Sequence, residues 1–159
     1  MNTHALTTMP GTGVRGVMAR ALDVLGRFPL PLLQLMFRLA VAAVFLKAGL
    51  NKLASWELTV QLFADEYKVP VLSPDFAAAM ATTFEIGCSM LLIVGLGTRL
   101  AALPLLGMIA VIQTFVYPSA YAEHLTWASL LLFLLTRGGG RWSADHLLGL
   151  EPPTPPLTS

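Results

Sequence analysis

The sequence predicts an all-α integral membrane protein: a four-helix bundle with an N-terminal interfacial amphipathic helix and a short helix in the first outer loop. Its 159 residues are 55% hydrophobic and only 12% charged, whereas soluble domains carry about 25% charged residues. Its apolar segments approach the roughly 20 residues that cross a bilayer. Short turns between these segments favour antiparallel packing within one small membrane domain.

The chain divides into a membrane domain and flanking segments. Residues 14–28 place apolar side chains on one helical face and arginines on the other, as in a helix that lies on a membrane surface. The N-terminal segment is polar and the C-terminal segment is rich in proline, so we expect both to be disordered. The expected parts are a tail at 1–13, the amphipathic helix at 14–28, a four-span domain at 30–150 and a tail at 151–159.

Proline and glycine mark the boundaries of the four expected spans. Pro31 lies near the start of the first span, Gly97 in the turn after the second, Pro118 after the third, and Gly138 after the fourth. The longest connection, 54–73, has helical spacing of apolar residues and is a candidate lid. The expected spans are about 30–53, 75–96, 99–117 and 120–137.

The distribution of arginines predicts the orientation in the membrane. Cations gather before the first span, in the turn after the second, and after the fourth, so both termini are expected in the cytoplasm. Ser143 is the expected N-cap of a short interfacial helix that contains Asp145. The residues expected to set topology or contact the interface, with anionic lipid as a second role for the arginines, are Arg99, Arg137, Arg141, Ser143 and Asp145.

Glu85 is an ionisable residue near the centre of an apolar segment. An acidic residue at that depth costs about 2.5–3.5 kcal/mol, so Glu85 needs a partner, a proton or a function. One interpretation is structural: a pair with Arg38 or Lys47, or a protonated acid inside the bundle. The other is functional: a proton acceptor, or a hydrogen-bond partner of a quinone.

Polar residues from three further segments are expected near Glu85. Lys47 and Asn51 share one helical face near the outer end of the first span. Gln113 and His124 lie near the outer ends of the third and fourth spans. Together they predict a polar pocket that opens outward, with Glu85 at its floor and Arg38 approaching from the inner side.

Composition excludes several kinds of chemistry. Cys88 is the only cysteine, which excludes a disulfide, a dithiol pair and a cysteine metal cluster. The three histidines do not lie in pairs on facing spans, so no haem site is expected, and no metal site is predicted. A net charge of +1 without a basic stripe does not indicate nucleic acid. A redox role would use a bound quinone or a partner's cofactor.

Four groups of residues resemble one family. They are Arg38 with Lys47 and Lys52, Glu85 before Gly87, the run Gly95-Leu-Gly-Thr-Arg99-Leu-Ala-Ala102, and the run Gly138-Gly-Gly-Arg141-Trp-Ser143-Ala-Asp145. Together they resemble the DoxX family of small four-helix membrane proteins over about residues 35–148. The resemblance implies a membrane bundle. Because some members are subunits of thiosulfate:quinone oxidoreductases or membrane anchors in thiol and oxidative-stress systems, it also implies a redox association.

The sequence therefore favours a redox-associated membrane subunit that binds a quinone-like or other small hydrophobic molecule in the outward pocket. It carries no stand-alone catalytic motif, so any enzymatic role would be as a subunit of a quinone-linked oxidoreductase. The alternative is a non-catalytic membrane anchor or assembly factor that docks a soluble partner, and transport of a small solute is less favoured. The lipid bilayer is the expected environment, and a soluble redox partner and a homo-oligomer are left open.

Overall fold

The computed structural model describes residues 13–150, and within this range the chain is helical without a strand. The expected tails at 1–13 and 151–159 lie outside the described residues, apart from Gly13. The elements are α1 (Val14–Gly26), α2 (Leu30–Ala54), α3 (Trp56–Leu62), the π-helical turn η1 (Phe63–Tyr67), α4 (Pro74–Val94), α5 (Thr98–Val111), the π-helical turn η2 (Ile112–Val116), the 3₁₀ turn η3 (Pro118–Ala120), α6 (Tyr121–Arg137) and α7 (Ala144–Leu147).

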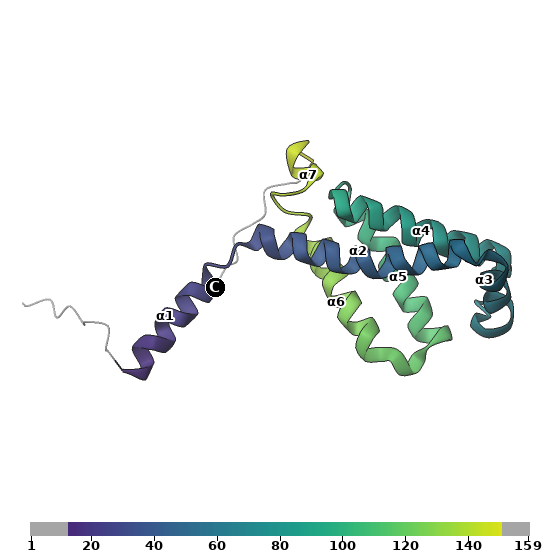
Figure 1. Ribbon diagram of the computed structural model, residues 1–159, viewed down its shortest axis with the longest axis horizontal. Coiled ribbons are helices and arrows are strands. Elements are labelled where there is room, and N and C mark those ends of the chain that lie inside the picture. Colours follow the sequence, from purple (N-terminus) through teal and green to yellow (C-terminus); the bar gives the residue numbers. More distant parts are fainter. Residues whose placement is uncertain (1–12, 151–159) are drawn as a thin grey trace, which may run out of the picture.

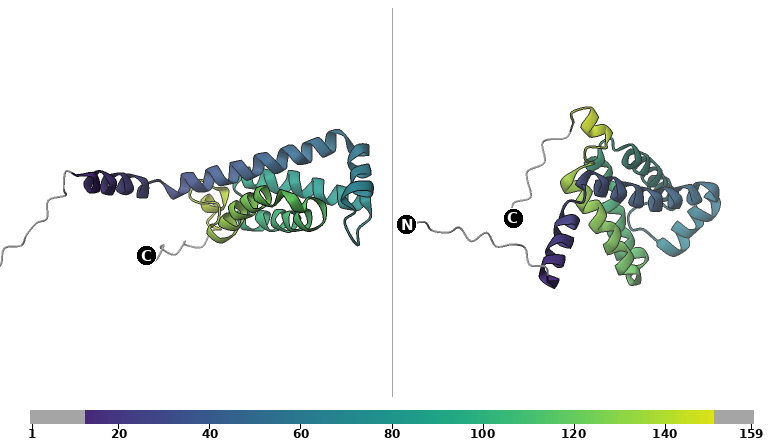
Figure 2. Two further views of the ribbon diagram at one scale, coloured as in Figure 1. Left: turned by 90° about the horizontal axis from the view of Figure 1, so that it is seen from below. Right: turned by 60° about the vertical axis from the view of Figure 1, so that its left-hand side comes forward.

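Helices α2, α4, α5 and α6 pack together around one apolar core (Figures 1 and 2). Helix α4 returns alongside α2 after the longest connection, and α5 contacts both α4 and α6. The side chains on the facing surfaces of the four helices interdigitate and are therefore shielded from water and from lipid. The most deeply buried apolar residues of this core are Val41, Ala42, Leu92, Ala102, Leu105, Leu131 and Leu134.

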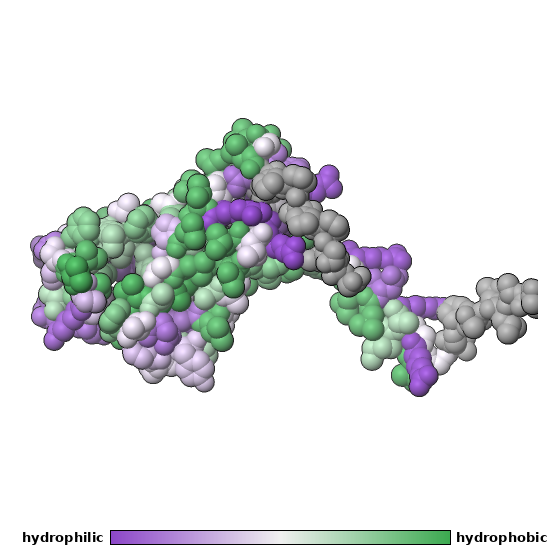
Figure 3. Space-filling model, turned by 180° about the vertical axis from the view of Figure 1, so that it is seen from behind, coloured by the Kyte–Doolittle hydropathy of each residue, from purple (hydrophilic) through white to green (hydrophobic). Residues whose placement is uncertain are grey.

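Three of the described helical segments are long and apolar enough to cross a membrane: Leu30–Ala54, Pro74–Val94 and Thr98–Val116. They correspond to the first three expected spans within a few residues. The fourth expected span forms α6, which packs in the bundle but has only 17 residues and does not reach the same length and hydropathy. Glu123 and His124 in its first turn explain its lower hydropathy. Apolar side chains cover much of the face in Figure 3, as a lipid-facing surface requires.

Helix α3 and the turn η1 run across one end of the bundle, between α2 and α4 (Figure 1). A second, smaller apolar cluster holds them there: Phe63 of η1 is buried against Ala77 and Ala78 in the first turn of α4. The connection then returns through Lys68 and Val71, which both have positive φ (42° and 74°). The strap formed by 56–73 therefore covers the end of the bundle where α4 begins.

Helix α1 extends away from the bundle (Figure 2), and none of its residues is buried. It ends at Gly26, two residues earlier than the expected helix at 14–28, because Arg27 caps its last turn. The Arg27 side chain also donates to Asp23 at 2.6 Å on the exposed surface. The apolar side chains of α1, such as Val17 and Leu22, are exposed in the chain alone.

Candidate functional site

A buried ion pair joins the first and second long helices. Lys52, in the last turn of α2, donates through Nζ to both carboxylate oxygens of Glu85, at 2.7 and 2.8 Å. Glu85 lies in the middle of α4 with only 3% of its surface exposed. Two bonds from one ammonium group neutralise a carboxylate that would otherwise be costly at this depth.

The partner of Glu85 differs from both sequence-based candidates. Lys47 is exposed; it lies five residues before Lys52 and so points about 140° away around the helix. Arg38 is buried, but it binds the far end of α4 instead. The expectation that Glu85 pairs with Arg38 or Lys47 was therefore wrong in its partner, while the expectation of a buried cation partner holds.

Gly49 allows α4 to approach α2 at the level of this pair. A Cβ atom added at Gly49 would lie 2.7 Å from Cγ1 of Ile86 and 3.0 Å from Cβ of Glu85. Real Cβ atoms do not tolerate the shorter distance, so a side chain here would push the helices apart. The close packing places the Glu85 carboxylate within reach of Lys52, one turn further along α2.

Arg38 binds the backbone at the opposite end of α4. Its Nε donates to the carbonyl of Leu92 at 2.9 Å and its Nη2 to that of Ile93 at 3.1 Å. Its Nη1 donates to the carbonyls of Gly139 (2.9 Å) and Trp142 (3.1 Å). Because the last carbonyls of a helix lack intrahelical partners and carry partial negative charge, a buried guanidinium satisfies them well. Arg38 therefore ties the end of α4 to the loop after α6 and is far from the pocket floor.

Three more side chains complete what we call the buried polar cluster, formed by Gln34, Arg38, Ser143 and Asp145. Gln34 donates to the carbonyls of Arg137 (3.2 Å) and Gly138 (3.3 Å). Asp145 accepts from the backbone N–H groups of Gly97 (2.6 Å) and Thr98 (2.9 Å), so it caps the start of α5 from 47 residues away along the chain. Ser143 accepts from the N–H of His146, which confirms it as the N-cap of α7.

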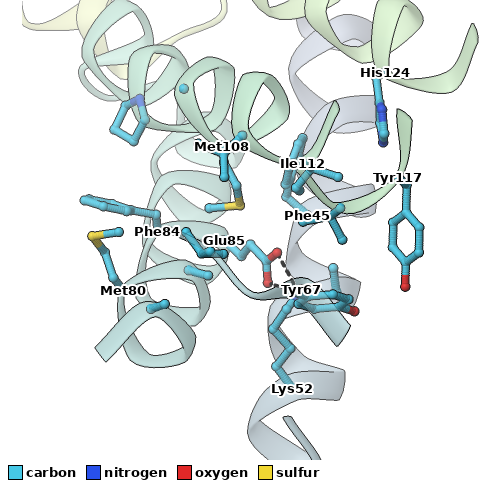
Figure 4. A pocket seen from close by; sticks show the side chains of 18 of the residues that line it. Phe45, Lys52, Tyr67, Met80, Phe84, Glu85, Met108, Ile112, Tyr117 and His124 are labelled. Atoms are coloured by element: carbon cyan, nitrogen blue, oxygen red, sulfur yellow. Dashed lines mark hydrogen bonds and ion pairs between the residues drawn. The ribbon is translucent and has the colours of Figure 1, made fainter. Parts of the chain in front are cut away.

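A cavity of about 600 Å³ lies at the other end of the bundle, beneath the strap (Figure 4). Apolar side chains from α2, α4, α5, α6, η1 and η2 form most of its wall, among them Phe45, Phe84, Met108, Ile112 and Trp127. Lys52 and Glu85 form one polar part of the wall, and Glu123 and His124 form another. The cavity thus combines a large apolar volume with a few ionisable groups, as ligand sites do.

Both π-helical turns face this cavity. Each is closed by a backbone bond spanning five residues, from Lys68 N–H to Phe63 O and from Tyr117 N–H to Ile112 O. They also contact each other. Tyr117, the residue after η2, donates through its hydroxyl to Glu66 at 2.8 Å, and its ring packs edge-on against Tyr67. Hydrogen bonds with Tyr67 and Glu66 raise the pKa of Tyr117, so its hydroxyl stays protonated. π-Helical turns are frequent at functional sites.

His124 lines the cavity, and Gln113 contacts it without lining the cavity itself, so of these two expected pocket residues only His124 faces the hollow. The Nδ1 atom of His124 is 2.7 Å from Oε1 of Gln113, and the Gln113 amide nitrogen donates to the carbonyl of Pro118 at 2.8 Å. The imidazole also packs against Trp127, with ring centroids 5.6 Å apart. His124 is 5% exposed and points from α6 into the cavity (Figure 4).

The remaining predicted residues lie elsewhere. Asn51 and Lys47 are exposed and do not line the cavity, because their face of α2 points away from α4. Arg141 is exposed and Arg99 half-buried. Arg137 is half-buried and lines a smaller hollow of about 430 Å³ between α6 and the start of α2.

Sequence reasoning missed Lys52 as the partner of Glu85, although a signal was present. The buried positions of α2 repeat every three or four residues, through Arg38, Val41, Phe45 and Gly49, and the next position on that stripe is Lys52. Lys47 falls between these positions. Within residues 13–150, no group of three His, Cys, Asp or Glu side chains could hold a metal ion.

Comparison with known proteins gives one match. The family model of DoxX matches residues 33–118, which is more than half of the chain. The matched region contains Arg38, Lys52, Glu85 and Gln113, whereas His124 and Asp145 follow it. No curated protein and no solved structure matches the chain.

Proposed function

The chain belongs to the DoxX family, and we propose that it binds a small apolar molecule with one polar end, of the quinone type, in the cavity beneath the strap. The observation that carries the proposal is the cavity itself: about 600 Å³ of mostly apolar space with the Lys52–Glu85 pair in its wall. Small-molecule sites in proteins typically enclose about 300–1,000 Å³ and use a few polar groups for orientation.

The position of the ion pair supports a role beyond packing. A buried pair often adds little net stability, because desolvation offsets its attraction. Arg38 and Asp145 already supply hydrogen bonds that tie the helices together at the other end of the bundle. A costly ion pair beside a mostly apolar cavity is better explained by contact with a ligand.

The membrane arrangement forms part of the proposal. With α6 as a fourth span, both termini would lie on one side of a bacterial inner membrane, and the arginines of α1 and of the loops favour the cytoplasmic side for them. The amphipathic α1 then lies on the cytoplasmic membrane surface, and the cavity and its strap face the outer side. A quinone could enter from the hydrocarbon region without crossing water.

A redox role would depend on a partner. Cys88 is the only cysteine and has no second thiol with which to exchange electrons. We therefore propose a redox-associated subunit, in which the cavity holds the quinone and a soluble partner supplies or removes electrons. The alternative is a membrane anchor that docks such a partner without a bound ligand. In that case the quinone test below should show no binding.

The test is a quinone titration of the full chain in mild detergent, read by tryptophan fluorescence. Trp127 lines the cavity, so a short-chain quinone should quench it with saturation, and Trp127→Phe should remove the saturable part. Mass spectrometry of the detergent extract should also detect a co-purified quinone. Absence of both signals would overturn the proposal.

A matched pair of glycine variants locates the site. A Cβ added at Gly107 or at Gly87 meets no atom within 4 Å, but only Gly107 lines the cavity. Gly107→Leu should fill part of the cavity and weaken binding roughly tenfold or more, whereas Gly87→Leu should leave it unchanged. Equal effects of the two substitutions would place the ligand elsewhere.

A further inference from the structure

The hydrogen bonds of Gln113 fix which nitrogen of His124 carries a proton. A backbone carbonyl can only accept, so the Gln113 group that contacts Pro118 O at 2.8 Å must be its NH₂. The amide oxygen therefore faces His124 Nδ1, at 2.7 Å. Because an amide oxygen can only accept, Nδ1 must donate. In the neutral imidazole, the proton is then on Nδ1 and Nε2 is an acceptor.

The acceptor atom, Nε2 of His124, is available to the cavity. His124 lines it and points into it (Figure 4), and no residue of the described range 13–150 donates a hydrogen bond to Nε2. The Trp127 ring against the imidazole restricts its rotation. An acceptor held in a mostly apolar wall favours a ligand that brings its own donor, since an unpaired buried polar group is costly.

Lys52 donates two of its three N–H groups to the oxygens of Glu85, so one N–H of that cation remains for a ligand. The wall therefore offers an acceptor at His124 Nε2 and a remaining donor at Lys52, and a ligand hydroxyl can serve either, whereas a dione or ether oxygen can only accept.

On this basis we propose that the cavity prefers hydroxyl-bearing aromatic ligands, such as quinols and phenols, over the corresponding diones and ethers. His124 Nε2 accepts the ligand hydroxyl, and Gln113 acts as a positioning residue that holds the tautomer. The proposal rests on the proposed function, because it specifies the ligand class of the same cavity.

A matched pair of probes tests the preference. The full chain in detergent is titrated calorimetrically with 4-heptylphenol and with 4-heptylanisole, which differ by methylation of the hydroxyl. The phenol should bind roughly tenfold more tightly, the ratio expected for one buried hydrogen bond. His124→Phe should reduce the ratio to about one. Equal binding of both probes to the wild type overturns the inference, whereas binding of neither probe, together with no quinone binding, overturns the proposed function.

The tautomer gives a readout that a merely structural role would not change. In ¹⁵N spectra of histidine-labelled protein, assigned with the His124→Phe variant, Nδ1 should be protonated and Nε2 unprotonated. The Nε2 signal should move with the phenol and not with the anisole. Gln113→Met should mix the tautomers and lower the ratio severalfold, and Gln113→Glu, which keeps an acceptor for Nδ1, should restore it. A protonated Nε2 in the wild type would contradict the inference.

Discussion

The two ends of the bundle use polar residues in different ways. In the buried polar cluster, Arg38 and Asp145 bind backbone groups at helix ends, so each replaces a bond that the helix itself cannot make. In the cavity, Lys52 binds Glu85 and Gln113 binds His124, side chain to side chain. The cluster encloses its polar atoms, whereas the cavity wall presents them to an apolar hollow.

This difference separates a structural site from a candidate ligand site within one helix. Arg38 and Lys52 belong to the same buried stripe of α2, and both are cations in the bundle interior. Arg38 donates to backbone carbonyls at the end of α4 and in the loop after α6, and its loss should damage the fold. Lys52 neutralises a carboxylate beside a cavity, and its loss should damage binding more than folding.

The largest effect on stability is expected from Arg38→Leu. The substitution leaves the carbonyls of Leu92, Ile93, Gly139 and Trp142 without this donor in a buried site, where 1% of Arg38 is exposed. The expected loss is on the order of 4 kcal/mol, seen as a sharp fall in folded protein by fluorescence-detected size exclusion. The exposed Arg141→Leu is the control and should behave as wild type. If both variants gave the same amount of folded protein, Arg38 would not be a structural residue and the two ends of the bundle would not differ in this way.

An intermediate effect is expected from breaking the ion pair. Glu85→Gln leaves Lys52 without its carboxylate, and Lys52→Met leaves Glu85 without its cation. Each should destabilise by about 2–3 kcal/mol, since removing one partner strands the other. The double variant Lys52→Met/Glu85→Gln should recover most of this loss, measured by thermal unfolding in detergent. Additive losses in the double variant would show that the two residues act independently.

A smaller effect is expected at the cap of α5. Asp145→Ala removes the acceptor of two backbone N–H groups and should cost about 1–2 kcal/mol, the usual value of an N-cap. Asp145→Asn keeps a capping oxygen and should lose less. Quinone affinity should be the same in both variants as in the wild type, measured by the tryptophan titration. A loss of affinity here would mean that the cluster also shapes the cavity.

The helices could be predicted from the sequence because length, hydropathy and turn residues act locally. The first three spans appear within a few residues of their expected bounds, and Ser143 caps α7 as expected. The fourth expected span is the 17-residue helix α6, which lies between the turn at Pro118–Ala120 and Gly138.

The partners of the polar residues could be predicted less well, because they depend on contacts distant in the sequence. Asp145 caps a helix that begins 47 residues earlier, and Arg38 binds carbonyls, which carry no side-chain signature. The π-helical turns and the tautomer of His124 depend on geometry that no periodicity encodes. Lys52 was accessible in principle, through the stripe that continues from Gly49.

Our main proposal is that the cavity binds a ligand through the Lys52–Glu85 pair, and that the buried polar cluster does not take part. Its most direct test is the quinone affinity of the double variant Lys52→Met/Glu85→Gln beside that of Asp145→Ala, with folding of both verified by size exclusion. We predict a roughly tenfold or greater loss of affinity in the folded double variant and none in Asp145→Ala. Wild-type affinity in the folded double variant would contradict it.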